Sequence, residues 1–151
     1  MYVSDLTRRN PITVRPTDDV VAAAHLMREH HIGYLVVVEA DFTEDTVRPI
    51  GVLTDRDIVL SIVARGVDPR AVTVKDIMTA NPVTIMRNDS VVKATQEMRR
   101  IGVRRLPVVG SLGELDGVLS LDDVLDAISG ELQNLAGAIH QERRIESSLR
   151  P

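Results

Sequence analysis

The chain contains one pattern twice, and this repetition constrains the fold more than any local feature. The segment 10–38 aligns without a gap to 81–109 at an offset of 71, and 12 of the 29 aligned pairs are identical. Both segments begin with Asn-Pro followed by an apolar residue, Thr and another apolar residue. A second similar pair, 51–57 and 117–123, follows at an offset of 66. Self-similarity of this kind predicts two copies of one structural unit.

Each copy is predicted to form a strand, a helix, two strands and a second helix, which together build a layered α/β domain. β-branched or dense apolar runs indicate the strands, and apolar residues at three- and four-residue spacing indicate the first helix. Asp18 and Asp89 are expected to cap these first helices. The extra residues of the first copy fall in 41–49, which predicts a hairpin loop. In chain order, the elements of the first copy are expected at 12–14, about 20–30, 35–38, 50–53 and from 55, and those of the second at 83–85, from 91, 106–109, 115–119 and from 121.

The two copies are expected to form one stable unit, because about 60 residues bury too little surface alone. A linker is indicated by Gly66, which can end a helix, and Pro69, which hinders a new one. Beyond Gly130, Leu132, Leu135 and Ile139 share one stripe and predict an added amphipathic helix. The expected domains are repeat 1 at 3–66, a linker at 67–73, repeat 2 at 74–129 and a helical tail at 130–151.

The composition argues against several kinds of chemistry. The chain has no cysteine, which excludes disulfides, thiol catalysis and thiolate metal sites. A net charge of -4 gives no general attraction to nucleic acid or anionic membrane. With no long apolar run and no signal-peptide pattern, the expected location is cytoplasmic. His25, His30 and His31 lack the spacing of a metal site, and no P-loop, Gly-x-Gly-x-x-Gly or Ser-His-Asp pattern occurs, so we expect neither a metal site nor an enzyme.

Each copy also places a hydroxyl and a carboxylate at a junction between a strand and a helix. Thr54 and Asp57 lie three residues apart there, and Ser120 and Asp123 repeat the arrangement. A helix N-terminus favours anionic oxygens such as those of phosphate, and a carboxylate can accept the two hydroxyls of a ribose. The pattern therefore suits a nucleotide. The alternative is that both side chains only cap their own helices.

The ordered motifs of both copies resemble the cystathionine-β-synthase (CBS) domain pair, or Bateman module, over about residues 3–129. These motifs are Asn-Pro-apolar-Thr-apolar, a helix, Leu-x-Val-Val, and Gly-apolar-Leu-[Thr/Ser]-x-x-Asp. The run Leu53-Thr54-Asp55-Arg56-Asp57, with Gly66 and Asp68-Pro69 after it, resembles small bacterial proteins that consist of a CBS pair and little else. The resemblance implies two pseudo-symmetric β-α-β-β-α repeats in one module, usually associated as a homodimer.

The resemblance also implies a non-catalytic sensor whose ligand binds in the cleft between the repeats. The candidate ligands are AMP, ADP, ATP, NAD and S-adenosylmethionine, and no cofactor is required. A protein partner, which the sequence does not identify, would read the ligand-dependent change. The alternative function is a ligand-free dimeric scaffold or interaction protein.

Two sites follow from the resemblance, and they are unequal because Gly33 and Tyr34 occupy the positions equivalent to Arg104 and Arg105. The two arginines are expected to reach the ligand's phosphates, which makes the first site the stronger one. Their alternative role is in ion pairs with Glu97 or Asp122. The first site comprises Thr54, Asp57, Val83, Thr84, Ile85, Arg104 and Arg105, and the second comprises Ile12, Thr13, Val14, Gly33, Tyr34, Arg56, Ser120 and Asp123.

Overall fold

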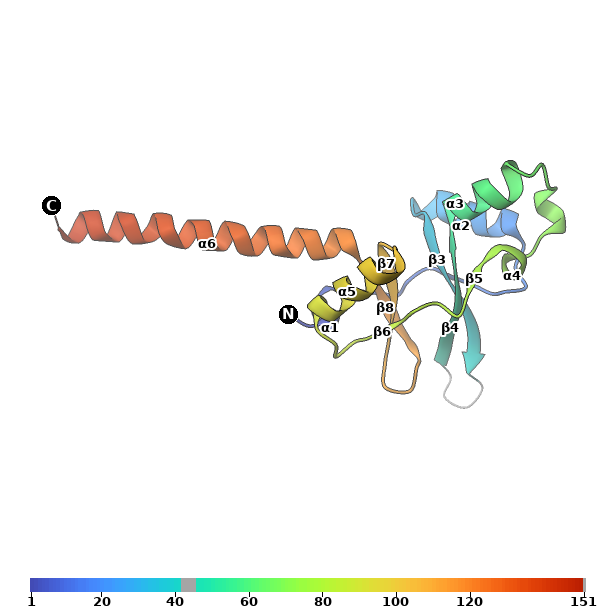
Figure 1. The fold of residues 1–151 in the computed structure, drawn as a ribbon, viewed down its shortest axis with the longest axis horizontal. Coiled ribbons are helices and arrows are strands. Elements are labelled where there is room, and N and C mark those ends of the chain that lie inside the picture. The colour runs from blue at the N-terminus through green and yellow to red at the C-terminus, as the bar shows by residue number, and fades with distance from the viewer. Residues whose placement is uncertain (42–45, 151) are drawn as a thin grey trace.

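A computed structural model describes residues 1–41 and 46–150 and contains two four-stranded sheets with helices packed against them (Figure 1). The predicted order of elements within each repeat is confirmed. The first repeat comprises β2 (Thr13–Val14), α2 (Val20–His30), β3 (Tyr34–Asp41), β4 (Thr46–Thr54) and α3 (Asp55–Ile58), which continues as a π-helix over Val59–Val63. The second comprises β6 (Ile85–Met86), α5 (Val91–Ile101), β7 (Arg105–Val109), β8 (Leu115–Ser120) and α6 (Leu121–Leu149). Part of the predicted hairpin loop is strand, and its residues 42–45 lie outside the described residues.

The short segments that precede each repeat are exchanged between the two sheets. The first segment forms α1 (Val3–Leu6) and β1 (Arg8–Arg9), and β1 pairs antiparallel with β8 of the second repeat. The other forms α4 (Val74–Ile77) and β5 (Thr79–Ala80), and β5 pairs with β4 of the first repeat. The sheet orders are therefore β2-β3-β4-β5 and β1-β8-β7-β6. This exchange ties the two repeats into one unit.

Each repeat has its own aliphatic core, and each core includes one valine from an exchanged segment. Val74 is fully buried in the first core, and Val3 is fully buried in the second. The remaining core residues are aliphatic or Met, as expected for a chain with only 2% aromatic residues. The first core contains Val14, Ala23, Met27, Leu35, Val37, Leu53 and Val74, and the second contains Val3, Ile85, Val91, Ala94, Met98, Leu106, Val108, Leu119 and Val124.

The capping residues of α2 and α5 lie one position after the predicted ones. Asp19 Oδ1 accepts a 2.7 Å hydrogen bond from the amide of Ala22, and Ser90 Oγ accepts one of 3.1 Å from Lys93. The prediction of Asp18 and Asp89 as the caps was wrong. Their carboxylates accept from backbone amides three residues earlier, at 2.8 and 3.1 Å, and so close the turn before each helix.

α6 is one continuous helix from Leu121 to Leu149, so the predicted tail helix is an extension of the last helix of the second repeat. It passes through Gly130 without a break and extends far beyond the two sheets (Figure 1). Its apolar stripe is exposed at Leu132, Leu135 and Ile139. None of the helices in the described part of the chain is long and apolar enough to cross a membrane.

Candidate functional site

Ser120 and Asp123 form a hydrogen-bonded unit at the start of α6. Ser120 is the last residue of β8, and its Oγ accepts a 3.1 Å hydrogen bond from the amide of Asp123. The Ser120 hydroxyl also donates to Asp123 Oδ2. The strand-to-helix junction therefore holds the carboxylate in one orientation.

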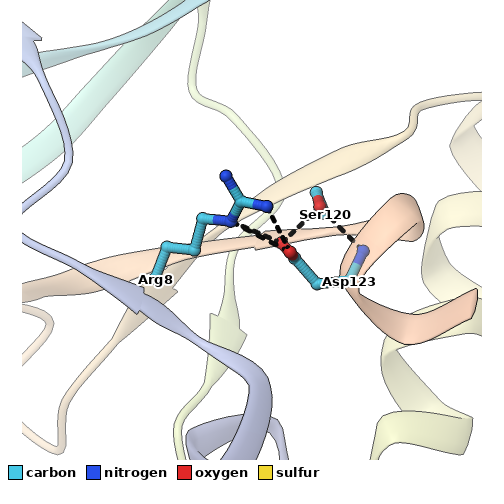
Figure 2. Close-up of polar contacts among 3 residues, drawn as sticks. All are labelled: Arg8, Ser120 and Asp123. Atoms are coloured by element: carbon cyan, nitrogen blue, oxygen red, sulfur yellow. Dashed lines mark hydrogen bonds and ion pairs between the residues drawn. The ribbon is translucent and has the colours of Figure 1, made fainter. Parts of the chain in front are cut away.

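Arg8 of β1 binds the same carboxylate through two nitrogens, as Figure 2 shows. The Arg8 Nε lies 2.9 Å from Asp123 Oδ1 and 3.0 Å from Oδ2, and Nη2 lies 2.6 Å from Oδ1. This two-nitrogen geometry suits a guanidinium and a carboxylate. The exchange of β1 onto the second sheet brings the two residues together, although 115 positions separate them.

The electrostatics of Asp123 result from two opposing effects. Partial burial raises the pKa of its carboxyl, but hydrogen bonds from Arg8 and Ser120 outweigh burial, so the pKa lies below its ordinary value. The stabilisation from this carboxylate is therefore present above the ordinary aspartate pKa. It is lost as the pH falls through the lowered value of the folded state.

Thr54 and Asp57 form the equivalent junction in the first repeat, where they make a reciprocal capping box. Thr54 Oγ1 accepts from the amide of Asp57 at 3.1 Å, and Asp57 Oδ2 accepts from the amide of Thr54 at 2.8 Å. Both side chains thus cap α3, as one of the two interpretations of the motif expected. Their role in binding a ligand stays a prediction.

Arg104 and Arg105 contact different partners in the structure. Arg104 Nη2 forms a 3.0 Å ion pair with Asp122 Oδ1, which is one of the alternatives that the sequence left open. Arg105 has its guanidinium carbon 5.8 Å from the ring centroid of Tyr34 in the first repeat, within reach of a cation-π contact. Glu97, the other suggested partner, instead binds Arg100 at 2.6 Å.

A cavity of about 370 Å³ lies between the repeats, and Asp123 is part of its wall. It brings together five residues predicted for the second site and Arg105, which was predicted for the first. The predicted residues in its lining are Ile12, Gly33, Tyr34, Arg105, Ser120 and Asp123.

The other predicted residues do not line this cavity. Val14 and Ile85 are buried in the two cores, at 3% and 2% exposure, so their side chains are committed to packing. The remaining residues outside its lining are Thr13 and Arg56 from the second predicted site, and Thr54, Asp57, Val83, Thr84 and Arg104 from the first.

The sequence interpretation missed Arg8 and Arg9, which both line the cavity. The sequence contains a signal for these two arginines, because they have no counterpart in the second copy. The offset of 71 that relates the repeats places Thr79 and Ala80 at the positions equivalent to Arg8 and Arg9. The pairing confirms this equivalence, because Arg8 lies opposite Val118 as Thr79 lies opposite Val52. The two arginines are therefore a second break in the internal symmetry.

Tyr34 is the other unusual residue of the cavity wall. Its hydroxyl is buried and has no hydrogen-bond partner among the residues that the structure describes. Burial raises the pKa of this hydroxyl, and the nearby Arg105 only partly opposes the shift. The Tyr34 hydroxyl therefore remains protonated. Within the described ranges, no group of three or more His, Asp or Glu side chains is arranged to hold a metal ion.

The fold defines a class of protein in which two β-α-β-β-α repeats pack together and enclose a cavity between them. The model of the CBS domain family matches residues 3–64 and 74–130, so the chain belongs to the CBS domain family. It contains two CBS domains, the tandem pair that the sequence motifs resemble.

Three known proteins illustrate the similarity. Protein MK0525 of Methanopyrus kandleri is 39% identical over 124 residues, which is 82% of this chain but only 60% of that protein. CBS domain-containing protein YhcV of Bacillus subtilis is 34% identical over 122 residues, or 81% of each chain. The solved structure of CBS domain protein PAE2072 from Pyrobaculum aerophilum, complexed with AMP, has a TM-score of 0.71 and 31% identity, and the match covers 82% of this chain and 89% of that one.

Proposed function

We propose that this chain is a non-catalytic regulatory module that binds an adenine nucleotide or a related adenosyl ligand between its two CBS repeats. The observation that carries the proposal is the cavity of about 370 Å³, whose wall combines residues of both repeats with the Asp123 carboxylate. This volume lies within the range of roughly 300–1,000 Å³ found for small-molecule sites. The AMP bound by the relative from Pyrobaculum aerophilum supports the choice of ligand class.

The chemistry of the wall suits the parts of a nucleotide. The Asp123 carboxylate can accept ribose hydroxyls, and the guanidinium groups of Arg9 and Arg105 can bind phosphate. Ile12 and Val118 offer apolar surface to a base.

Regulation would follow from the position of the ligand. A molecule in this cavity contacts both repeats, so its binding free energy depends on how they are placed relative to one another. A ligand shifts such an equilibrium only by its difference in affinity between the two arrangements. AMP, ADP, ATP, NAD and S-adenosylmethionine are the ligands to compare, and a partner protein would read the shift.

Replacing the carboxylate tests this proposal. We expect Asp123→Asn to weaken AMP binding by about 10- to 100-fold in isothermal titration calorimetry, because an amide is a poorer acceptor for two hydroxyls than a carboxylate is. Asp57→Asn is the matched control, since Asp57 occupies the same capping position in the other repeat.

The control also distinguishes the alternatives. Weakening by Asp57→Asn alone would assign the ligand to the first predicted site instead. If none of the five ligands binds to protein purified without ligand, the chain acts as a dimeric scaffold and the sensor proposal fails.

We also propose that two copies of the chain associate through α6. Apolar residues recur along this helix at alternating spacings of three and four, which is the seam of a two-stranded coiled coil. The stripe comprises Leu125, Ile128, Leu132, Leu135 and Ile139, all of them 45% or more exposed. A helix with glycines at 130 and 137 is only marginally stable alone, so a second helix stabilises it.

Charge favours an antiparallel arrangement of the two helices. The first half of α6 carries Asp122, Asp123, Asp126 and Glu131 and no basic residue, a net charge of -4 over 121–135. The half at 136–150 carries three arginines and two glutamates, a net charge of +1. An antiparallel copy opposes these two halves, whereas a parallel copy places the acidic halves side by side.

We expect the chain to have twice its 16.6 kDa mass in light scattering after size exclusion, and Leu132→Glu with Leu135→Glu to restore the monomer mass. A charge on the seam is desolvated without a partner, which opposes pairing. Gln133→Glu with Asn134→Glu adds the same charge beside the stripe and should leave the dimer intact. A monomeric parent chain, or a dimer that survives both apolar replacements, would rule out this interface.

A further inference from the structure

We infer that Arg8 makes the cavity selective for adenosyl ligands that carry phosphate, because its guanidinium exchanges the Asp123 carboxylate for the phosphate of the ligand. This inference rests on the proposed function and specifies the ligand class of the same site. The two-nitrogen contact in Figure 2 places the Arg8 guanidinium on the Asp123 carboxylate, the acidic group of the cavity best suited to a ribose.

The ion pair between Arg8 and Asp123 has good hydrogen-bond geometry but contributes little net free energy, so a ligand can replace it. The Arg8 side chain is 74% exposed, whereas that of Asp123 is 16% exposed. An ion pair with one exposed partner is screened by solvent and contributes little net stability. Arg8 can therefore change rotamer without repacking a core, while Asp123 stays held by Ser120.

The other charges of the cavity wall favour an anion. Asp122, its second carboxylate, is paired with Arg104, which lies outside the lining. Among the described residues, no acidic side chain forms an ion pair with Arg9 or Arg105. Once Arg8 releases Asp123, three guanidinium groups surround a ligand that brings negative charge.

The charges of the cavity wall also distinguish classes of adenosyl ligand. The phosphate of a nucleotide replaces the Asp123 carboxylate as the partner of Arg8, and Asp123 is then free to bind the ribose. Adenosine must break the ion pair between Arg8 and Asp123 without offering a replacement. S-adenosylmethionine offers one carboxylate, but its sulfonium and ammonium groups give it a net positive charge. The site therefore favours AMP, ADP or ATP over adenosine and S-adenosylmethionine.

This selectivity belongs to one side of the module only. Thr79 occupies the position of Arg8 in the other repeat, with the same pairing to its neighbouring strand. The junction at Thr54 and Asp57 thus has no arginine at that position to exchange. The pseudo-symmetry of the repeats supplies two carboxylates, and Arg8 makes their charge environments different.

The test compares AMP with adenosine by calorimetry in the parent chain and in Arg8→Ala. We expect the variant to bind AMP about 10- to 100-fold more weakly, which is the range for a hydrogen bond to a charged group. Adenosine affinity should stay constant or increase, because Asp123 is then free. Arg8→Lys should keep part of the preference for AMP, since its charge remains without the planar fork.

Arg100→Ala is the matched control, because it removes another exposed arginine that binds a carboxylate through two nitrogens. Arg100→Ala should leave the affinities for AMP and for adenosine unchanged. An equal loss of AMP and adenosine binding in Arg8→Ala would mean that Arg8 only supports the fold of the site, and tighter AMP binding would mean that it only blocks Asp123. Either result overturns the inference.

Pyrophosphate separates this inference from the proposed function. If adenosine and all five candidate ligands fail to bind the parent chain, the adenosyl proposal fails. Saturable stabilisation by pyrophosphate in thermal denaturation that is lost in Arg8→Ala would then still support Arg8 as the phosphate-responsive residue. Stabilisation that is absent, or equal in the two proteins, would overturn that role as well.

Discussion

Replacing Val3 with aspartate is expected to unfold the second repeat, although Val3 lies at the N-terminal end of the first repeat in the sequence. Val3 is fully buried in the second core, among residues that include Leu106 and Leu119. Its amide donates a 2.9 Å hydrogen bond to the carbonyl of Asp89, just before α5. A carboxylate in this aliphatic core has no partner, so we expect a loss of at least about 3 kcal/mol in the free energy of unfolding.

Hydrogen exchange locates the effect. In Val3→Asp, the amides of β7 and β8 should lose protection before those of β3 and β4. Val74→Asp is the matched control, because Val74 is equally buried in the first core and should produce the opposite order. If each replacement instead exposed the repeat that follows it in the sequence, the exchange of the two segments would be incorrect.

This exchange is also the part of the fold that the sequence analysis did not predict. The repeat, the apolar spacing and the Asn-Pro steps indicated the order of elements, since each is a local signal repeated at a known offset. β1 and β5 have two residues each, too few for a periodicity. Their pairing depends on how the repeats pack together, which no local pattern encodes.

The candidate site, like the fold, was predictable where local sequence signals determine it. The spacing of Ser120 and Asp123 indicated a hydroxyl and a carboxylate at a helix start, and the structure has them hydrogen-bonded there. The positions of the cations were harder to predict, because an arginine side chain is long and its partner depends on tertiary packing. Arg104 accordingly pairs with Asp122, while Arg8 reaches Asp123 across an exchanged strand.

Gly117→Ala is expected to displace β1 from the second sheet. A Cβ at this position of β8 would overlap the backbone carbonyl of Arg8 and the Cγ2 methyl of Thr7. Neither group lies at the end of a flexible side chain, so the strand itself must shift. Overpacking of this kind costs typically about 1–3 kcal/mol, which urea denaturation can measure.

Gly51→Ala is the matched control, because Gly51 occupies the same position against β5 in the first repeat. There a Cβ would lie 2.5 Å from Sδ of Met78, and an unbranched methionine side chain can change rotamer. The loss of stability should therefore be smaller than for Gly117→Ala. The two variants should also differ in AMP binding. β1 carries Arg8 and Arg9, which line the cavity, so Gly117→Ala should weaken the affinity for AMP, whereas Gly51→Ala should leave it unchanged. Equal losses of stability with unchanged AMP affinity would mean that the cavity does not depend on the position of β1.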